Sequence, residues 1–506
     1  MSADQLFIGI DSGTQGTKGI VLSRNEGKIL ATAYAAHQTI ENNQGRREQA
    51  PRWWIEACTA VMGEMLQKHG ISRVDVRAIG ISGQQHGMVP LNGKGEVIRP
   101  AKLWCDTETA LQCEEITHKI GGADRVIRLI GNTIAAGFTA SKILWMKQHE
   151  PKNYDQMAMV LLPHDYINFW LTGEKKSEFG DASGTAYFDI KKRTWSTPIL
   201  QAIDASGKLN TCLPELIPSN SPVATVKPDI AKQFQLPPDV LVSSGGGDNM
   251  MAAIGTGNVT PGIVTASLGT SGTIYSFTDH PVVDPNGELA AFCSSSGGWL
   301  PLVCTMNVTV STELTRDLLG LSLNDFNKIA TGAPLGSEGI LLLPYFNGER
   351  TPSLPNATAA FFGLTSANYT PSNLSRASME GATLGLRYGM DVLKEQGITP
   401  TEIRLVGGGA RSSLWRQMVA DIFNCAVVCP VSSEAGAMGA ALQAMWCYLE
   451  QKEGGSSILA ITDHFVSLDE STRTQPERSG VSQYADIYQH YLQLNSLMKP
   501  MLEGVS

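Results

Sequence analysis

Two short segments rich in glycine and threonine could hold a polyphosphate. The segment GTQGT runs from Gly13 to Thr17, and GTSGT runs from Gly269 to Thr273, about half a chain length later. Such a turn between two strands presents backbone N–H groups and hydroxyls without a bulky side chain, which suits phosphate oxygens. For either copy alone, the alternative is an ordinary hairpin that needs glycine for a positive φ angle. Finding both favours two hairpins that hold the β- and γ-phosphates of a nucleotide.

Other phosphate-binding motifs do not fit the chain. No Gly-Lys pair has the spacing of a Walker loop, and the segments GGGARS and GTGNVT lack the third glycine of a dinucleotide fingerprint. The sequence therefore disfavours both of these nucleotide-binding classes.

Two aspartates stand beside the glycines. Asp11 ends the first apolar run, and Asp248 lies in GGGDN, just before an expected helix. Both should be ionised at neutral pH, so one could hold Mg²⁺ or its waters while the other accepts a hydroxyl proton. Phosphoryl transfer requires this division of roles. The alternatives are a turn-initiating aspartate for Asp11 and a helix N-cap for Asp248.

Strands and helices in a repeated order should position these groups. Residues 6–10, 16–23 and 28–36 predict a β-meander, followed by a helix over 51–70 and a buried strand over 76–83. A strand, glycine turn and strand recur over 262–277, and residues 402–423 predict a strand, a turn and an amphipathic helix. We therefore expect two related α/β domains, 1–241 and 242–506, joined through the proline-rich segment 213–240. The second ends in a helical tail.

Composition limits the partners and the compartment. The chain has 506 residues, a net charge of −9 and nine cysteines without paired close spacing. This charge disfavours nucleic acid and anionic membranes as general partners, and the cysteines with no signal-like N-terminus predict a cytoplasmic protein with reduced thiols. No apolar run is long enough to predict a membrane crossing.

Longer motifs resemble the FGGY family of carbohydrate kinases, nearly from end to end. Residues 137–149 (GFTASKILWMKQH) and 359–380 are similar to its two signatures, and 345–352 (YFNGERTP) is similar to the stretch before the second. The family belongs to the superfamily of actin, hexokinase and heat-shock chaperone ATPases. The resemblance implies two actin-like (ribonuclease H-like) domains around a central cleft, the first binding sugar and the second ATP.

The resemblance also implies roles for individual residues. Asp248 would be the general base that takes the proton of the sugar hydroxyl, and Asp11 would organise Mg²⁺. The implied sugar contacts, besides Asp248, are Gln85, His86, Trp104, Asp106 and Asn249. The implied ATP contacts are Gly13, Thr14, Lys18, Gly269, Thr270, Gly408, Gly409 and Ser413. Ser413 could equally cap a helix, His86 could be a turn histidine satisfied by backbone, and Trp104 could be core packing.

The motifs GQQHGM, EQAPRWW, LLPHDY, LTGE and GGGDN favour, within the family, a pentulose and above all D-xylulose as the substrate phosphorylated by ATP. One departure bears on this choice. The chain reads LWCDTE, with Cys105 and Glu108 where many bacterial relatives have asparagine and arginine, whereas Ala50 for aspartate lies outside the proposed chemistry.

Three alternatives stay open. The same chemistry could act on ribulose, gluconate or glycerol, because one changed charge can redirect hydroxyl recognition. An actin- or chaperone-like ATPase would share the hairpins but would not need GGGDN and GQQHG. A sugar-binding regulator without catalysis would be expected to lack Asp11 or Asp248. The resemblance also suggests a homodimer.

Overall fold

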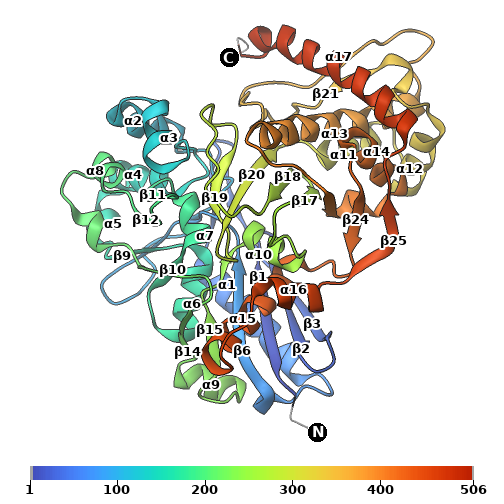
Figure 1. Ribbon diagram of the computed structural model, residues 1–506. Coiled ribbons are helices and arrows are strands. Elements are labelled where there is room, and N and C mark those ends of the chain that lie inside the picture. Colours follow the sequence, from blue (N-terminus) through green and yellow to red (C-terminus); the bar gives the residue numbers. More distant parts are fainter. Residues whose placement is uncertain (1–3, 504–506) are drawn as a thin grey trace. The chain divides into compact units, whose positions relative to one another are not determined.

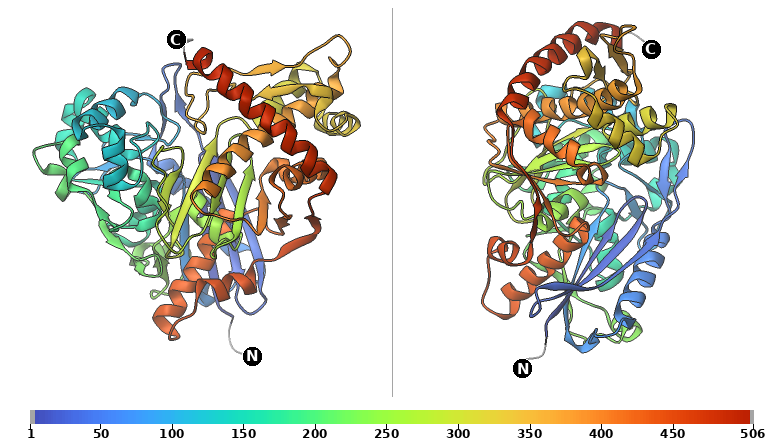
Figure 2. Two further views of the ribbon diagram at one scale, coloured as in Figure 1. Left: turned by 45° about the horizontal axis from the view of Figure 1, so that its top comes forward. Right: turned by 90° about the vertical axis from the view of Figure 1, so that its right-hand side faces the viewer.

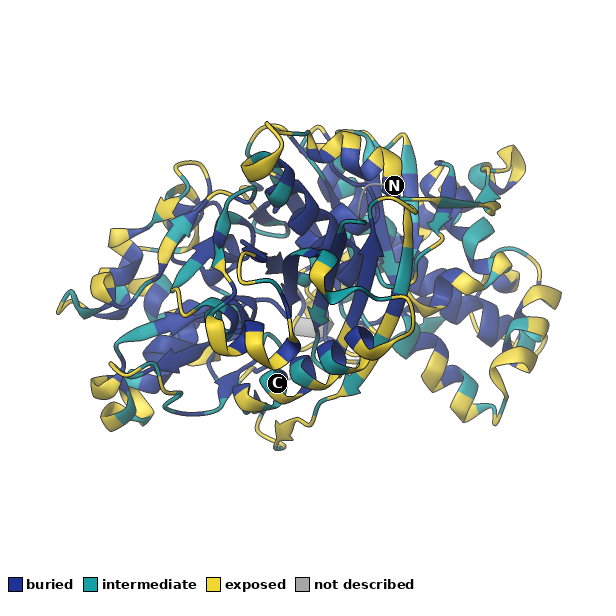
Figure 3. Cartoon of the chain, turned by 90° about the horizontal axis from the view of Figure 1, so that it is seen from below, coloured by how far each residue is buried: buried dark blue, intermediate teal, exposed yellow. Residues whose placement is uncertain are grey.

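The computed structural model describes residues 4–503 and divides the chain into two compact units. Unit 1 comprises residues 1–260, 277–300 and 434–466, and unit 2 comprises 261–276, 301–433 and 467–506. Each contains a twisted sheet covered by helices, and the strands are largely buried (Figure 3). The predicted α/β class with two domains is confirmed.

The main sheet of unit 1 has the strand order β14-β15-β6-β1-β2-β3, and β16 also pairs with β6. β1, β2 and β3 form the predicted meander of antiparallel pairs, while β6 runs parallel to both β1 and β15 (Figure 1). The strands are β1 (Leu6–Ser12), β2 (Gly16–Ser23), β3 (Lys28–Ala36), β6 (Val76–Gly83), β14 (Pro222–Thr225), β15 (Leu241–Ser243) and β16 (Gly246–Gly247).

The sheet of unit 2 repeats this plan. β20, β18 and β17 are joined as antiparallel pairs, and β23 and then β24 continue in parallel, before β25 closes the edge in antiparallel fashion. Its strands are β17 (Ile263–Leu268), β18 (Gly272–Ser276), β20 (Trp299–Thr305), β23 (Glu402–Val406), β24 (Val427–Pro430) and β25 (Leu468–Thr474). The two GT hairpins occupy the same place in the two plans, between β1 and β2 and between β17 and β18.

Short strands and helices complete each unit. The short strands are β4 (Ile40–Glu41), β5 (Arg47–Gln49), β7 (Val89–Leu91), β8 (Ala101–Lys102), β9 (Met159–Leu161), β10 (Lys176–Glu178), β11 (Phe188–Asp189), β12 (Thr194–Trp195), β13 (Glu215–Ile217), β19 (Ala290–Cys293), β21 (Leu341–Leu343) and β22 (Ala360–Phe362). The helices of unit 1 are α1 (Pro51–Gln67), α2 (Ala110–Ile120), α3 (Ala123–Ile130), α4 (Thr139–His149), α5 (Pro151–Gln156), α6 (Pro163–Thr172), α7 (Phe179–Ala182), α8 (Thr197–Ile203), α9 (Pro228–Phe234), α10 (Asp248–Gly255), α15 (Ala435–Lys452) and α16 (Ile458–Phe465). Those of unit 2 are α11 (Thr309–Leu318), α12 (Leu323–Gly332), α13 (Pro371–Glu395), α14 (Ser413–Phe423) and α17 (Arg478–Glu503), the predicted tail helix, red in Figure 2.

Helix α15 covers one face of the β1–β6 pair although it lies late in the chain. A Cβ at Gly9 would collide with the carbonyl oxygen of Ala437, and one at Gly80 would collide with that of Ala440. The two strand glycines therefore let the helix backbone approach the sheet directly. The close approach fixes α15 against the two strands that carry much of the candidate site.

Two sequence expectations differ from this arrangement. The proline-rich segment 213–240 is not a crossing between domains, because it forms β13, β14 and α9 within unit 1, where Pro222 begins a strand and Pro228 a helix. The first change of unit falls at residue 260 rather than at the predicted 241, and two later segments belong to unit 1. Proline at the first position of a strand or helix removes no needed hydrogen bond, so it does not end regular structure there.

No helix among residues 4–503 is long and apolar enough to cross a membrane. All nine cysteines lie in this range and are free thiols, as predicted.

Candidate active site

Three parallel strand ends place the predicted catalytic residues together in unit 1. β1 and β6 pair with Asp11 opposite Ser82, and β16 pairs with β6 so that Gly246 also stands opposite Ser82. The chain leaves β6 into Gln84, Gln85 and His86, and it leaves β16 directly into α10 at Asp248. The carboxyl ends of parallel strands form a common edge, and ligands of open α/β sheets bind there. The segments IDSG, GQQHG and GGGDN thus meet through register.

Asp11 and Asp248 are the two acids at this edge. Neither occupies the position of its alternative role, which was a turn start for Asp11 and a helix N-cap for Asp248. Asp11 is the sixth residue of β1 rather than a turn starter, and Ser82 Oγ donates to its Oδ1 over 2.6 Å. Asp248 is the first residue of α10, and the N-cap is Gly247. Burial and, after it, the charge of Asp11 raise the pKa of Asp248 to about 7 against bonds from Asn249, so the expectation of a fully ionised Asp248 at neutral pH is wrong. Burial also raises the pKa of Asp11, although Ser82 and Lys18 oppose the shift.

Hydrogen bonds connect three of the residues that were predicted to contact the sugar. Asn249 Nδ2 donates to Gln85 Oε1 over 2.7 Å and to Asp248 Oδ1 over 3.1 Å, and its backbone N–H donates to the same Asp248 oxygen over 2.8 Å. Gln85 Nε2 lies 3.0 Å from the sulfur of Met250. Gln85, Asp248 and Asn249 therefore form one hydrogen-bonded group beside Asp11.

His86 is buried in an unusual conformation. Its φ angle is +59°, and its Nδ1 lies 3.2 Å from Oδ1 of Asp181, so the alternative of a histidine satisfied by backbone alone does not describe it. Asp181 is in α7, a residue that the sequence did not single out.

The first GT hairpin is held by side chains from several segments. Gly13 N–H donates to Gly16 O over 3.0 Å, Gln49 Nε2 donates to Thr14 O over 2.7 Å, and Trp104 Nε1 donates to Thr14 Oγ1 over 3.0 Å. Trp104 is only half-buried and makes this polar contact, so simple core packing does not describe it. Neither Gly13 nor Gly16 has a positive φ angle. A Cβ at Gly16 would instead collide with Tyr34 and the backbone of Ala35.

Lys18 follows this hairpin in β2. Its ammonium lies 2.9 Å from Oε2 of Glu434, and its side chain is 46% exposed. The residue that the resemblance assigns to phosphate thus already pairs with a carboxylate of its own unit.

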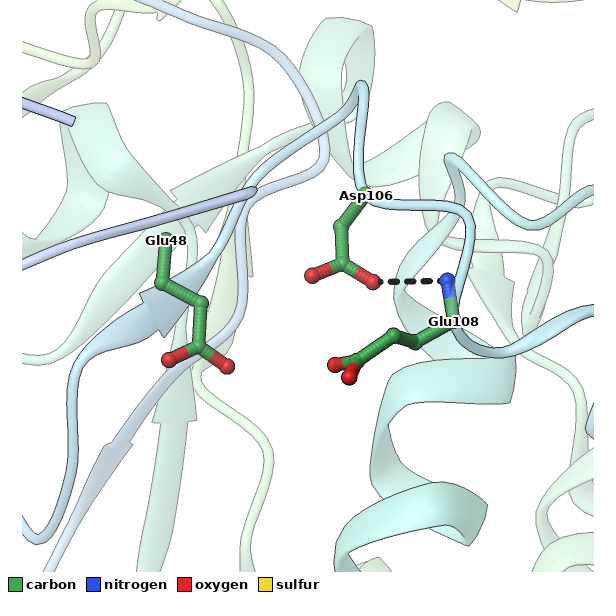
Figure 4. A group of neighbouring side chains, drawn as sticks. All are labelled: Glu48, Asp106 and Glu108. Carbon is green, nitrogen blue, oxygen red and sulfur yellow. Dashed lines mark hydrogen bonds between the residues drawn. The ribbon is translucent and has the colours of Figure 1, made fainter. Parts of the chain in front are cut away.

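The two acids of the LWCDTE segment, Asp106 and Glu108, both contact the buried Lys102. Lys102 Nζ lies 2.5 Å from Glu108 Oε2, 3.0 Å from Asp106 Oδ2 and 3.3 Å from Glu48 Oε1. Figure 4 shows the three carboxylates converging, and Glu108 N–H donates to Asp106 Oδ1 over 3.1 Å. The Lys102 ammonium already supplies these carboxylates with the positive charge that a bound metal ion would otherwise supply. Asp106 also accepts from Arg47 N–H over 2.9 Å, so this predicted sugar contact is engaged within its own loop.

The second GT hairpin and the predicted adenosine residues lie in unit 2. Gly269 O accepts from Thr309 N–H over 2.9 Å, and Thr270 O accepts from Val308 N–H over 3.1 Å. As in the first copy, the hairpin glycines do not have positive φ angles, so the alternative explanation for their presence is wrong.

Beyond β23, the glycine turn leads into α14. A Cβ at Gly408 would meet nothing within 4 Å, whereas one at Gly409 would press on Leu268 and the ring of Trp415. The α14 N-cap is Ser412, whose Oγ accepts from Trp415 N–H, and Ser413 follows as the first helical residue. The cap alternative for Ser413 is therefore wrong.

A cavity of about 490 Å³ elsewhere in unit 1 contains none of the predicted site residues. It is lined by four aromatic residues, by Arg193 and by backbone around Gly297.

The site residues that sequence reasoning missed are Ser82, Lys102, His164 and Asp181. The motif LLPHDY contained His164, but nothing in its spacing pointed to the partners.

Comparison with known proteins identifies the class. Residues 6–255 match the N-terminal domain and residues 264–448 the C-terminal domain of the FGGY family of carbohydrate kinases. The chain belongs to this family.

Individual relatives show which carbohydrate kinases this chain resembles. A xylulose kinase from Haemophilus influenzae is 45% identical over 491 residues, which cover 96% of this chain and 99% of the relative. A solved structure of a xyloylose kinase from Brucella ovis has a TM-score of 0.91 at 27% identity, covering 98% of this chain and 100% of its own. A gluconate kinase from Lactobacillus acidophilus has a TM-score of 0.92 at 24% identity, with full coverage of both chains, and shows the fold alone.

Proposed function

We propose that this carbohydrate kinase transfers the γ-phosphoryl group of ATP to O5 of D-xylulose. The observation that carries the proposal is the edge of unit 1 where Asp248 joins Gln85 and Asn249 through hydrogen bonds beside Asp11. Polar side chains of this kind suit a polyhydroxyl substrate, and the acid among them has the pKa of a general base at neutral pH. The similarity to xylulose kinases supports the choice of sugar.

In the proposed reaction, Asp248 accepts the proton of the sugar hydroxyl as that oxygen attacks the γ-phosphorus. A bond forms between O5 and phosphorus, the bond to the β-phosphate oxygen breaks, and ADP leaves with the electron pair. A pKa of about 7 leaves Asp248 about half ionised at neutral pH. A general base is most effective when its pKa lies near the pH at which the enzyme works. General-base help contributes about 10²–10⁴ in rate, so positioning supplies much of the remainder.

Asp11 fits the role of holding Mg²⁺. Its carboxylate faces the glycine Gly436 of α15, where a Cβ would lie 2.7 Å from Oδ2 of Asp11, so the absence of a side chain leaves room beside this oxygen. Hard oxygen ligands suit Mg²⁺, which usually keeps several waters and needs few carboxylates. When bound, the ion would neutralise charge on the transferred phosphoryl group. The chain's own contribution is the Asp11 carboxyl group, which the bond from Ser82 Oγ orients.

For ATP, we propose contacts to Gly13 and Thr14 in the first hairpin and to Gly269 and Thr270 in the second. Gly13 N–H donates to Gly16 O within the hairpin, so the groups proposed to bind phosphate oxygens are the other backbone N–H groups and the threonine hydroxyls. For the adenosine end, the open space at Gly408 supports close approach of a ligand to the backbone, and Ser413 presents a hydroxyl that is not used as a helix cap. Gly409 serves packing against Trp415.

The sugar contacts of this proposal are Gln85, His86, Trp104 and Asn249. Asp106 acts through the loop that carries Trp104, because its carboxylate binds Lys102 and Arg47. The ion pair with Glu434 makes Lys18 a weaker candidate for phosphate. A homodimer and a cytoplasmic location stay predictions from the sequence.

The test is ADP release by the purified protein with ATP and Mg²⁺ against D-xylulose, D-ribulose, gluconate and glycerol. We expect D-xylulose to give the highest kcat/KM, and Asp248→Asn to lower kcat by about 10²–10⁴. If another sugar gives the highest value while the variant is inactive, the base assignment holds and the substrate is wrong. If no sugar stimulates ADP release, or if the variant stays active, the proposed site is wrong.

A further inference from the structure

A buried row of acids and histidines leads from helix α6 to His86. Asp165 Oδ1 lies 2.9 Å from Nε2 of His164, and Nδ1 of His164 lies 3.1 Å from Oδ2 of Asp181. The other oxygen of Asp181, Oδ1, lies 3.2 Å from Nδ1 of His86. The first three side chains are at most 1% exposed and His86 is 6% exposed. The sequence brings these residues from three separate segments.

The charges of the neighbouring groups in the row decide whether Asp181 is ionised. His164 stands between two carboxylates, and although burial lowers its pKa, both acids together raise it well above the usual value. His164 is therefore a cation at neutral pH. Burial raises the pKa of Asp181, but bonds from His164 and His86 bring it down to about 2. An ionised carboxylate oxygen thus faces His86 across the working pH range.

The peptide and the ring of His86 are both held in place. The backbone N–H lies 3.3 Å from Asp181 Oδ1, while the carbonyl accepts from Lys142 Nζ over 2.8 Å and from Thr139 Oγ1 over 3.1 Å. These contacts stabilise a left-handed conformation, with φ of +59°, that is costly outside glycine.

The ring has little freedom either. It packs edge-on against Phe138 with centroids 4.9 Å apart, and it lies 5.4 Å from the ring of Phe292. Gly184 completes the enclosure, because a Cβ there would overlap the imidazole. Such a fixed ring can present only one nitrogen to Asp181.

We propose that Asp181, held by His164, is a positioning residue that keeps the proton of neutral His86 on Nδ1, so that Nε2 accepts a hydrogen bond from a sugar hydroxyl. The inference rests on the proposed function, in which His86 contacts the sugar. Its physical basis is that a carboxylate bound to one imidazole nitrogen selects the tautomer and leaves the other nitrogen as an acceptor. Three further charged groups face this row: Lys142, which binds the His86 carbonyl, Glu178, which binds the backbone of α7, and Asp248, whose pKa the charge of Asp181 helps to raise.

The experiment compares Asp181→Asn with Glu178→Gln as a matched control. Both substitutions replace a buried carboxylate of one short segment by its amide, but Glu178 accepts from Gly180 and Asp181 N–H groups over 2.7 Å and is directed at the backbone. We expect Asp181→Asn to raise KM for D-xylulose by roughly ten- to a hundredfold, with a much smaller change in KM for ATP. Glu178→Gln should change both constants by less than about threefold.

Nitrogen NMR of ¹⁵N-histidine in the parent protein gives a readout that does not depend on turnover. The His86 resonances are assigned by their loss in His86→Gln, and we expect the pattern of a neutral ring protonated at Nδ1, changed in Asp181→Asn and kept in Glu178→Gln. Protonation at Nε2 in the parent would overturn the inference even if Asp181→Asn failed to fold. Equal effects of the two variants on KM would also overturn it. A parent with the Nδ1 tautomer but no activity on D-xylulose would instead refute the proposed function.

Discussion

Removing the charge of Lys102 should destabilise unit 1 strongly, because three acids converge on it. In Lys102→Met, the carboxylates of Glu48, Asp106 and Glu108 lose an ammonium that lies 2.5–3.3 Å from them. Lys102 is fully buried and stacks 4.0 Å from the ring of Trp145, so methionine preserves the apolar contact and removes the charge. Breaking a buried ion pair from one side costs about 3–5 kcal/mol. For a unit of more than 300 residues, that loss corresponds to a fall in Tm of roughly 5–8 °C.

Differential scanning calorimetry measures this change, and Lys119→Met is the matched control. Lys119 lies 2.7 Å from Glu115, but both side chains are more than one third exposed. Such surface pairs contribute about 0–1 kcal/mol. A Tm for Lys102→Met no lower than that for Lys119→Met would refute the argument from buried charge.

The pH dependence of the Lys102→Met defect provides a second check. In the parent, burial raises the pKa of Glu108, but the bond from Lys102 and the nearby Arg46 bring it below the usual value. A depressed pKa stabilises the fold above the unfolded value of about 4, and this contribution is lost as pH falls. Without Lys102 the pKa of Glu108 should rise, so the penalty should be full at pH 8 and smaller at pH 5. A defect that stays constant over this range would contradict the explanation.

Further predictions concern the reaction and the nucleotide. Burial and a neighbouring charge raise the pKa of Asp248 to about 7, so its active, ionised form should be lost below that pH. At constant free Mg²⁺, kcat/KM should therefore fall with decreasing pH, with a midpoint near 7. A flat profile from pH 6 to 8 would argue against Asp248 as the base. Gly436→Ala fills the space beside Asp11, the proposed metal ligand, and should lower kcat by about 10²-fold. The control is Gly63→Ala, where a Cβ meets nothing within 4 Å and kcat should stay unchanged. Equal activity of the two variants would count against the packing argument. Ser413→Ala should raise KM for ATP by roughly two- to tenfold without a change in Tm, and Ser412→Ala should lower stability by about 1 kcal/mol with KM unchanged, so an exchange of these effects would reverse the two roles.

Much of the local structure followed from short patterns. The three strands of the meander, β6, the turn after β23 and helix α14 were predicted because apolar periodicity and glycine act over a few residues. The repeated GT turn predicted two sheets of one plan, and the sheets share that plan. The reason given for its glycines was wrong, because Gly16 is required by close packing against Tyr34 rather than by its φ angle. A sequence does not distinguish these two needs.

The candidate site was predictable where one motif supplies one role, and unpredictable where partners come from distant segments. Asp11 and Asp248 were placed by their motifs, and strand register then put them on one edge. Glu108 looked like a change in sugar recognition, yet it binds Lys102 at the end of β8, an ammonium that also pairs with Glu48 of the distant strand β5. The motif gave no sign of this pairing, since a side-chain direction depends on the loop around it.

The sequence by itself determined the family and the two-domain α/β plan, and it predicted the two acids of the proposed reaction, because these depend on residue types at short spacing. Only the tertiary structure decided that α15, some 350 residues after β6, packs on β1 and β6, and that Asp181 faces His86. The physical reason is that such contacts are set by close backbone approach and by burial of matched charges, and both arise between segments whose separation along the chain carries no signal.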